Sequence, residues 1–193
     1  VKSWQTNPSY GTGYVGAGKL SAGEMAGRTP TAYVRGAVKF TLPSGLTGAQ
    51  VTSAYLQLYT KRYQKYAADS DDYVVNINRV TADWNESSTA DPGYTSVTSV
   101  NMYNKTNEYT LVSVPITQLV KDWVDGVHAN YGILLSATGP DANTGPEEDI
   151  DELLYIEYYS YDSITYYPRI KLNLSWQVFS QSVGGATITP AGA

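Results

Sequence analysis

The stretch Ala54-Tyr55-Leu56-Gln57-Leu58-Tyr59 alternates between aliphatic side chains and polar or tyrosine side chains. A repeat of two residues is the period of a β-strand, so Leu56 and Leu58 share one face and Tyr55 and Tyr59 share the other. The same alternation recurs at residues 34–42, 75–78, 110–116, 131–137, 154–158 and 169–176. Since one apolar face per strand is typical of antiparallel sheets, the sequence predicts an all-β fold.

One segment breaks this alternation. Its apolar residues recur at the three- and four-residue spacing of a helix face: Ile116, Leu119, Val120, Trp123, Val124 and Val127. Pro115 precedes the segment and Gly126 lies near its end, as is usual at helix boundaries. We therefore predict a single antiparallel jelly-roll β-sandwich over residues 1–176, with one short capping helix at 116–125.

The apolar positions of these stretches form the predicted core: Val38, Phe40, Leu56, Leu58, Ile77, Trp84, Val114, Leu119, Trp123, Ile133, Leu135, Ile156, Ile170 and Leu172. Residues 1–27 are rich in glycine and have almost no apolar run, so we expect a loop with one short strand there. Residues 177–193 form a strand-capable C-terminal tail without an obvious partner in sequence order.

Composition narrows the classes of function. The formal net charge is −5 with 13 Lys and Arg residues, and there is no basic run, which argues against nucleic acid or an anionic membrane as the main partner. No apolar run approaches the roughly 20 residues of a membrane span. The absence of cysteine does not fix the compartment, but the chain is rich in Tyr, Ser, Thr, Gly and Asn, which indicates an extracellular or cell-surface protein. Three sequons make Asn85, Asn104 and Asn173 candidate glycosylation sites.

An acidic segment at 141–152 holds six carboxylates in twelve residues. Calcium prefers six to eight hard oxygen ligands, so this segment is a candidate Ca²⁺ site, whose ligands would be Asp141, Glu147, Glu148, Asp149 and Asp151. The alternative is a solvated acidic loop. A weaker candidate of the same kind is Asp69, Asp71 and Asp72.

No catalytic constellation is evident, and we expect no enzymatic activity. The single histidine, His128, follows Gly126 in a predicted turn, and no nucleophile, phosphate-loop or zinc motif occurs. Asp83 and Glu86 flank Trp84; we interpret them as a turn whose carboxylates accept backbone hydrogen bonds while Trp84 closes one end of the sandwich.

Tyrosines are unusually numerous, at 18 of 193 residues. Tyr55, Tyr59 and Tyr63 are expected to point away from the leucine core, and a second group lies at 155–167. A tyrosine buries apolar area while keeping a polar hydroxyl, which suits protein interfaces and sugar platforms. An ordinary outer face of a sandwich is the third interpretation.

The order of landmarks along most of the chain resembles a family of secreted β-sandwich modules. The matching segments are 7–11, 35–43, 51–59, 79–86 (Arg-Val-Thr-Ala-Asp-Trp-Asn-Glu), 114–126, 130–135 and 168–172. The chain is in this respect similar to DNRLRE-type domains, which are related to disaggregatase repeats and to some carbohydrate-binding modules. The resemblance implies a jelly-roll module of surface and extracellular proteins, without catalytic residues.

Two functions follow as expectations. The first is an exported structural subunit that assembles with copies of itself into a fibre or filament. Its tail would pair as an added strand on a neighbouring copy through Val183, Thr187, Ile188 and Thr189, at an edge left open because little strand precedes Asn7. The second is a module that binds a polysaccharide. Such modules usually accompany a catalytic domain, and these residues encode none, which favours the first. The competing account of the tail is that it folds back on its own sheet.

Overall fold

Strand β5 (Val51–Lys65) organises the fold because it takes part in two sheets. In the computed structural model its first half pairs with β8 (Leu111–Pro115) on one side and β11 (Arg169–Leu174) on the other, and its second half pairs with β10 (Leu154–Tyr158), always antiparallel. The structure describes residues 2–7, 11–17, 20–25, 32–65, 74–85, 92–102, 107–138, 154–160, 163–175, 182–183 and 186–187.

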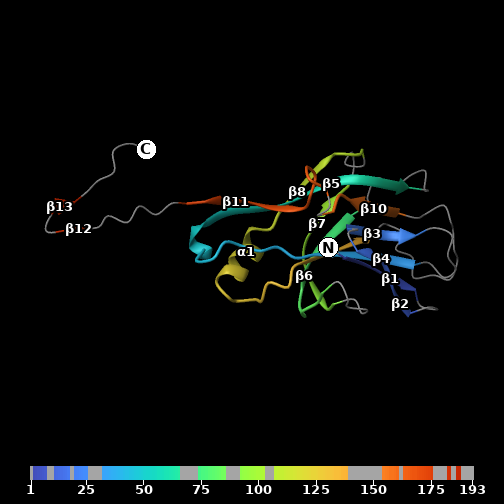
Figure 1. Cartoon of the computed structure of the whole chain (residues 1–193), viewed down its shortest axis with the longest axis horizontal. Helices are drawn as coiled ribbons and strands as arrows, with labels where there is room; N and C mark the ends of the chain where they lie inside the picture. Colours follow the sequence, from blue (N-terminus) through green and yellow to red (C-terminus); the bar gives the residue numbers. More distant parts are fainter. Residues whose placement is uncertain are drawn as a thin grey trace.

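From β10 the pairing continues through five further strands: β3 (Leu20–Met25), β4 (Ala32–Val38), β9 (Ile133–Thr138), β6 (Val74–Val80) and β7 (Tyr94–Asn101). The order is therefore β11-β5-β10-β3-β4-β9-β6-β7, with β8 attached to β5 and β1 (Lys2–Asn7) attached to β4. Strand β2 (Gly11–Ala17) pairs with β1. In Figure 1, β8 and β11 run along one side of the body and β1, β2 and β6 along the other.

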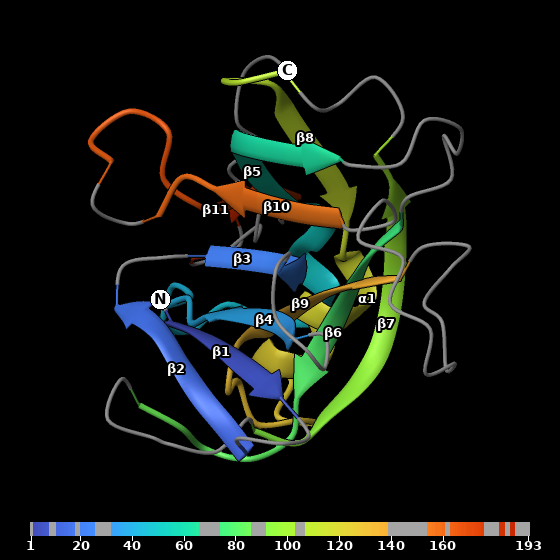
Figure 2. The ribbon, with the colours of Figure 1, turned by 90° about the vertical axis from the view of Figure 1, so that its right-hand side faces the viewer.

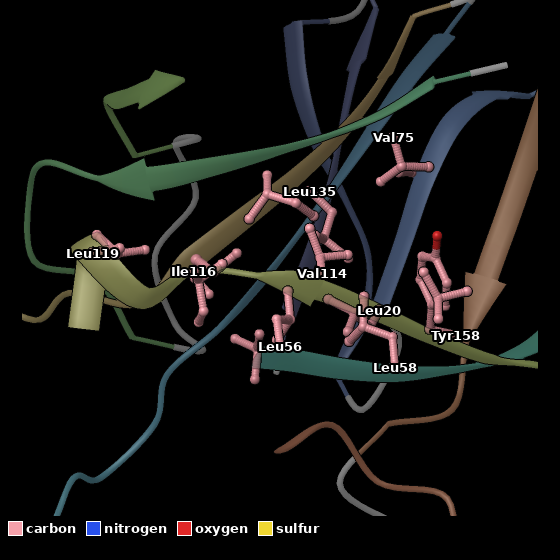
Figure 3. Close-up of a cluster of buried hydrophobic side chains, with 14 of the residues drawn as sticks. Leu20, Leu56, Leu58, Val75, Val114, Ile116, Leu119, Leu135 and Tyr158 are labelled. Atoms are coloured by element: carbon pink, nitrogen blue, oxygen red, sulfur yellow. The ribbon is translucent and has the colours of Figure 1, made fainter. Parts of the chain in front are cut away.

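The core lies between these two groups of strands. Figure 3 shows Leu56 and Leu58 of β5 and Val114 of β8 directed toward Leu135 of β9 and Val75 of β6, and all five side chains are fully buried or nearly so. The remaining predicted core positions are buried as well, apart from three that are partly buried against the same cluster: Phe40, Ile170 and Leu172. The all-β sandwich is thereby confirmed, and the jelly-roll connectivity stays a prediction.

Helix α1 (Thr117–Val124) begins just after β8 and confirms the short helix expected from the apolar spacing. Its buried face consists of Leu119, Val120 and Trp123. The helix is tied to the 3-10 turn η1 (Gly48–Gln50) because the Asp125 carboxylate accepts a hydrogen bond of 2.7 Å from the Gly48 amide. Helix α1 therefore covers the end of the core beside the start of β5.

The N-terminal region differs from the sequence-based expectation. Instead of a loop with one short strand, it forms the three strands β1, β2 and β3. Leu20 and Ala22 of β3 are fully buried, and β1 pairs with β4 over Lys2 to Thr6. The low strand propensity of glycine and alanine is overridden because β3 pairs with β4 and β10, and β2 pairs with β1. The open edge expected from a missing first strand is therefore filled by β1.

The outward face of the sheet also differs from the expected polar surface. Ala37 and Asn78 alternate with the core positions Val38 and Ile77, yet both are buried. Ala37 belongs to a second apolar cluster with Val80, Trp84 and Leu134, and the Asn78 amide donates hydrogen bonds of 3.1 Å to the Leu134 carbonyl and to Ser136 Oγ. These residues bury both faces of the sheet near β4, β6 and β9, so simple alternation fails there.

Candidate functional site

The C-terminal tail contains two short strands, β12 (Ser182–Val183) and β13 (Ala186–Thr187), which pair with each other. Among the pairings of the described residues, none connects this hairpin to the strands of the sandwich. The predicted interface residues Val183 and Thr187 are thus in strand conformation, whereas Ile188 and Thr189 lie outside the described residues.

The described sandwich leaves several strands with a single hydrogen-bonded neighbour. Strands β7 and β11 end the principal order, β8 pairs with β5, and β2 pairs with β1. A strand at an edge directs part of its N–H and C=O groups away from its neighbour, where another chain can bind them. A strand could be added at each of these four edges.

The predicted interface residues Tyr55 and Tyr59 lie on the outer face of β5 and are half-buried. Arg169 of β11 crosses this face: its Nε donates a hydrogen bond of 2.9 Å to Gln57 Oε1, and its Nη2 lies 3.1 Å from the Tyr59 hydroxyl. The guanidinium carbon also lies 5.7 Å from the centre of the Tyr59 ring. Tyr59 therefore faces away from the core, as expected, and is held by neighbouring side chains.

Tyr59 is part of a cluster of four tyrosine rings, which we call the tyrosine cluster: Tyr59, Tyr109, Tyr159 and Tyr166. Ring centres are 5.2 Å apart for Tyr59 and Tyr166, 5.5 Å for Tyr109 and Tyr159, 4.8 Å for Tyr109 and Tyr166, and 5.3 Å for Tyr159 and Tyr166. These separations are in the range of favourable aromatic pairs. The cluster joins β5 to the turn before β8 and the segment after β10.

Tyr109 holds the exposed side of this cluster. It has φ of 65° and is 50% exposed. A left-handed conformation is costly for a residue with a large side chain, and such residues concentrate at functional sites. A hydrogen bond of 2.7 Å from the Tyr109 amide to the Thr60 carbonyl supports this conformation. The cluster thus presents a half-exposed ring on a backbone that is fixed by the sheet.

A carboxylate lies beside the same rings. The Tyr159 hydroxyl donates a hydrogen bond of 2.6 Å to Glu108, and Tyr109 and Tyr159 stack with an angle of 16° between their planes. Desolvation and then this hydrogen bond raise the pKa of the Tyr159 hydroxyl above its usual range. Aromatic faces next to hydrogen-bonding groups are chemically suited to binding sugar rings or another protein surface.

Tyr158 belongs to the core and not to this surface. Its side chain is fully buried, and its hydroxyl lies 3.5 Å from the sulfur of Met102. Burial raises the pKa of this phenol. Tyr158 is therefore buried on the same side as Ile156, and within the tyrosine group at 155–167 it contributes to the core.

The turn around Trp84 agrees with the interpretation for Asp83, whereas Trp84 itself packs in the second apolar cluster with Ala37, Val80 and Leu134. The Asp83 carboxylate accepts hydrogen bonds of 2.9 Å from the Trp84 amide and 2.6 Å from Lys39 Nζ. The hydrogen bond from Lys39 and then the one from the Trp84 amide lower the pKa of Asp83 below its ordinary value of 3.8. Lys39 Nζ also lies 5.1 Å from the centre of the Trp84 ring and near the Trp84 carbonyl. Glu86 lies outside the described residues.

Several predicted sites lie outside the described residues. These are the candidate calcium ligands Asp141, Glu147, Glu148, Asp149 and Asp151, the weaker group Asp69, Asp71 and Asp72, and the sequon at Asn104. Within the described part of the chain, no group of three or more His, Cys, Asp or Glu side chains is placed to hold a metal ion.

The other two sequon residues are exposed, Asn85 after β6 and Asn173 on β11. The Asn173 amide donates a hydrogen bond of 2.6 Å to Ser53 Oγ. His128 lies in the bend after α1, where its backbone amide donates to the Asp122 carbonyl at 3.2 Å. No helix in the described ranges has the length and apolar character needed to cross a membrane.

Sequence reasoning missed both strand β7 and the position of Tyr109. Strand β7 is exposed along most of its length, so its residues show no apolar alternation. The available signal was its high content of β-branched residues, Thr95, Val97, Thr98 and Val100, after Pro92-Gly93. Tyr109 gave no signal, because only the pairing of β5 with β8 brings it beside residues 159 and 166.

Comparisons with known proteins add no family assignment. No protein-family model matches the chain, and no curated protein sequence matches it. The resemblance to DNRLRE-type modules therefore stays an expectation.

Proposed function

We propose that this chain is an extracellular structural subunit that assembles with copies of itself into a filament or surface fibre by adding a β-strand to a neighbour. The observation that carries the proposal is the C-terminal hairpin: β12 and β13 pair with each other, and none of the described pairings joins them to the sandwich. A strand-capable segment of this kind can satisfy the backbone groups of an edge in another copy.

The composition of the tail supports the same function. Residues 182–189 read Ser-Val-Gly-Gly-Ala-Thr-Ile-Thr and carry no charge. The stretch Ala186-Thr187-Ile188-Thr189 alternates small or apolar with polar side chains, so an added strand would place Ala186 and Ile188 on one face. Main-chain hydrogen bonds would provide affinity, and these alternating side chains would provide register.

The wider composition supports an extracellular location. The chain has 16% charged residues, against about 25% in average soluble proteins, and is rich in tyrosine. Exposed sequon residues at Asn85 and Asn173 are compatible with glycan attachment outside the cell.

Electron microscopy of the full chain and of a variant lacking residues 182–193 tests the proposal. We expect filaments from the full chain and a folded monomer from the shortened chain, with an unchanged far-UV circular dichroism spectrum for the sandwich. A full chain that stays monomeric, or a shortened chain that still forms filaments, contradicts the proposal.

A second candidate function is polysaccharide binding, favoured by the tyrosine cluster and by the half-exposed ring of Tyr109. A soluble polysaccharide in the gel should then slow the migration of the unmodified protein, and it should slow the Tyr109→Ala and Tyr166→Ala variants less. Tyr94→Ala, at a residue that is 41% exposed on β7, is the matched control. Equal migration of all variants with and without a panel of neutral and acidic polysaccharides contradicts this function.

A further inference from the structure

The edges of the sandwich are not equally open to an added strand. Natural proteins protect edge strands with charged side chains, proline, short length or β-bulges. Strand β11 carries Arg169 and Lys171, and β8 has five residues and ends at Pro115, which lacks a backbone N–H. Strand β2 holds three glycines in seven residues, and glycine weakens a strand.

Strand β7 is the least protected of these edges. Its eight residues, Tyr94-Thr-Ser-Val-Thr-Ser-Val-Asn101, contain no charge, no proline and no glycine. Half of them are the β-branched residues valine and threonine, which favour strand structure. Its pairing with β6 has one irregularity: Ile77 pairs with Thr98 and Asn78 with Ser96, so Val97 of β7 is the extra residue, as in a β-bulge. By length and composition, β7 is therefore the edge best suited to continue a sheet.

Strand β7 also exposes apolar groups along its length. Tyr94 is 41% exposed and Val97 is 39% exposed, and Thr95 and Ser96 between them are exposed as well. Figure 2 shows β7 following the outer side of β6 along one margin of the sheet. An added strand would cover these side chains as well as bind the outward backbone groups.

The origin of the tail relative to β7 gives the contact its direction. The tail follows β11, and β11 and β7 are the two opposite ends of the hydrogen-bonded order β11-β5-β10-β3-β4-β9-β6-β7. A segment that leaves from one end and binds the other end of the next copy makes a heterologous contact. Such contacts propagate into filaments unless the rotation between copies closes a ring.

We propose that the outer edge of β7 is the acceptor for the C-terminal segment 182–189 of a second copy. The inference rests on the proposed function and adds to it the identity of the receiving strand. Both segments are uncharged and combine β-branched with small or polar residues, so neither brings a charge that an added strand would have to bury.

A cross-linking experiment tests this pairing directly, because the native chain has no cysteine. The full-length double variant Val97→Cys/Thr187→Cys, treated with a short bismaleimide, should give a ladder of dimers, trimers and larger species. The matched control is Leu111→Cys/Thr187→Cys, which moves the first thiol to a residue of β8 that is 42% exposed, and it should stay largely monomeric. The cross-linker spans a shift of one or two residues, so the result does not depend on an assumed register.

Each other pattern of cross-linking overturns the proposal. A ladder from the β8 pair instead of the β7 pair identifies a different acceptor. A single product of monomer mass with faster migration from the β7 pair shows that the tail folds back on its own sandwich. No cross-linked species from either pair, under conditions where filaments are present, places the tail elsewhere.

A charge variant provides a second, independent measurement. The double variant Thr95→Lys/Val97→Lys adds two positive charges to exposed positions of β7 and should raise the critical concentration for filament formation at least tenfold. Leu111→Lys on β8 is the control and should leave it unchanged. If filaments are lost without residues 182–193 but form normally in the β7 lysine variant, the assignment of β7 is wrong while strand addition stands. If filaments persist without the tail, the proposed function itself is wrong.

Discussion

The two tryptophans whose side chains are described, Trp84 and Trp123, allow the energy of one hydrogen bond to be separated from the energy of packing. Trp84 and Trp123 are 5% and 6% exposed. Trp84 Nε1 donates a hydrogen bond of 2.8 Å to the Tyr131 carbonyl, whereas Trp123 Nε1 is buried without a hydrogen-bond partner in the described part of the chain. The same substitution, Trp→Phe, at each position removes the same atoms and the same indole N–H.

The expected difference follows from the hydrogen-bonding state of each indole. Trp84→Phe leaves the Tyr131 carbonyl without its donor, and a lost or unsatisfied hydrogen bond of this kind costs about 1–3 kcal/mol. Trp123→Phe removes a buried N–H group that has no hydrogen-bond partner. The desolvation cost of that group disappears with it, and this offsets part of the stability lost through poorer packing. The weaker ring of phenylalanine also reduces the cation–π contact with Lys39 at the first position. We therefore expect Trp84→Phe to be more destabilising than Trp123→Phe by about 1–3 kcal/mol.

Urea unfolding of both variants and of the unmodified chain, followed by far-UV circular dichroism, measures this difference. In a domain of this size 1 kcal/mol moves the melting temperature by about 2–4 °C, so thermal melts should separate the two variants by about 2–12 °C. The measurement is best made with the chain lacking residues 182–193, so that assembly does not affect the melts. Equal destabilisation, or a larger loss for Trp123→Phe, would refute the reasoning.

Three further predictions concern stability and cations. Leu56→Ala, at a fully buried position between β8 and β11, should cost about 2–5 kcal/mol, and a loss below about 1 kcal/mol in urea unfolding would contradict the assigned core. Lys39→Met should raise the pKa of Asp83 toward 3.8 in a carboxyl NMR titration, because the ammonium group that lowers this pKa most is removed. In the unmodified chain the pair stabilises the fold above about pH 4, and this stabilisation is lost as the pH falls through the lowered pKa. An unchanged pKa in the variant would show that the pair does not form. The candidate calcium site at 141–152 predicts that Ca²⁺ raises and a chelator lowers the melting temperature, whereas an identical melt in both conditions would reject the site.

Individual strands were predictable where one face is buried and the other is more exposed to solvent. On β5 the buried Leu56 and Leu58 alternate with side chains of the outer face, such as the half-buried Tyr59. On β8 the buried Val112 and Val114 alternate with exposed residues. Helix α1 was predictable for a similar reason, since Leu119, Val120 and Trp123 pack on the core at helical spacing. In each case the spacing of apolar residues within the segment indicates which of its faces is buried.

The same reasoning failed where burial or exposure affects both faces. Ala37 and Asn78 lie on a face that a second cluster covers, and the exposed strand β7 lacks a buried face of the usual kind. Strand β1 and the glycine-rich strand β2 have almost no apolar pattern of their own, and they pair with each other and, through β1, with β4. Periodicity carries no information about such neighbours.

The sequence by itself determined the class of this protein: an antiparallel β-fold with one short helix, a leucine- and valine-rich core, a low charge and an uncharged C-terminal tail. These properties depend on composition and on side chains a few residues apart, which the chain order records. Only the tertiary structure decided that β5 is shared by two sheets, that β1 fills the expected open edge, that β7 and β11 end the strand order, and that Tyr109 meets Tyr159 and Tyr166. The physical reason is that edges and clusters arise from hydrogen bonds and contacts between segments far apart in the chain, and no local period encodes which segments meet.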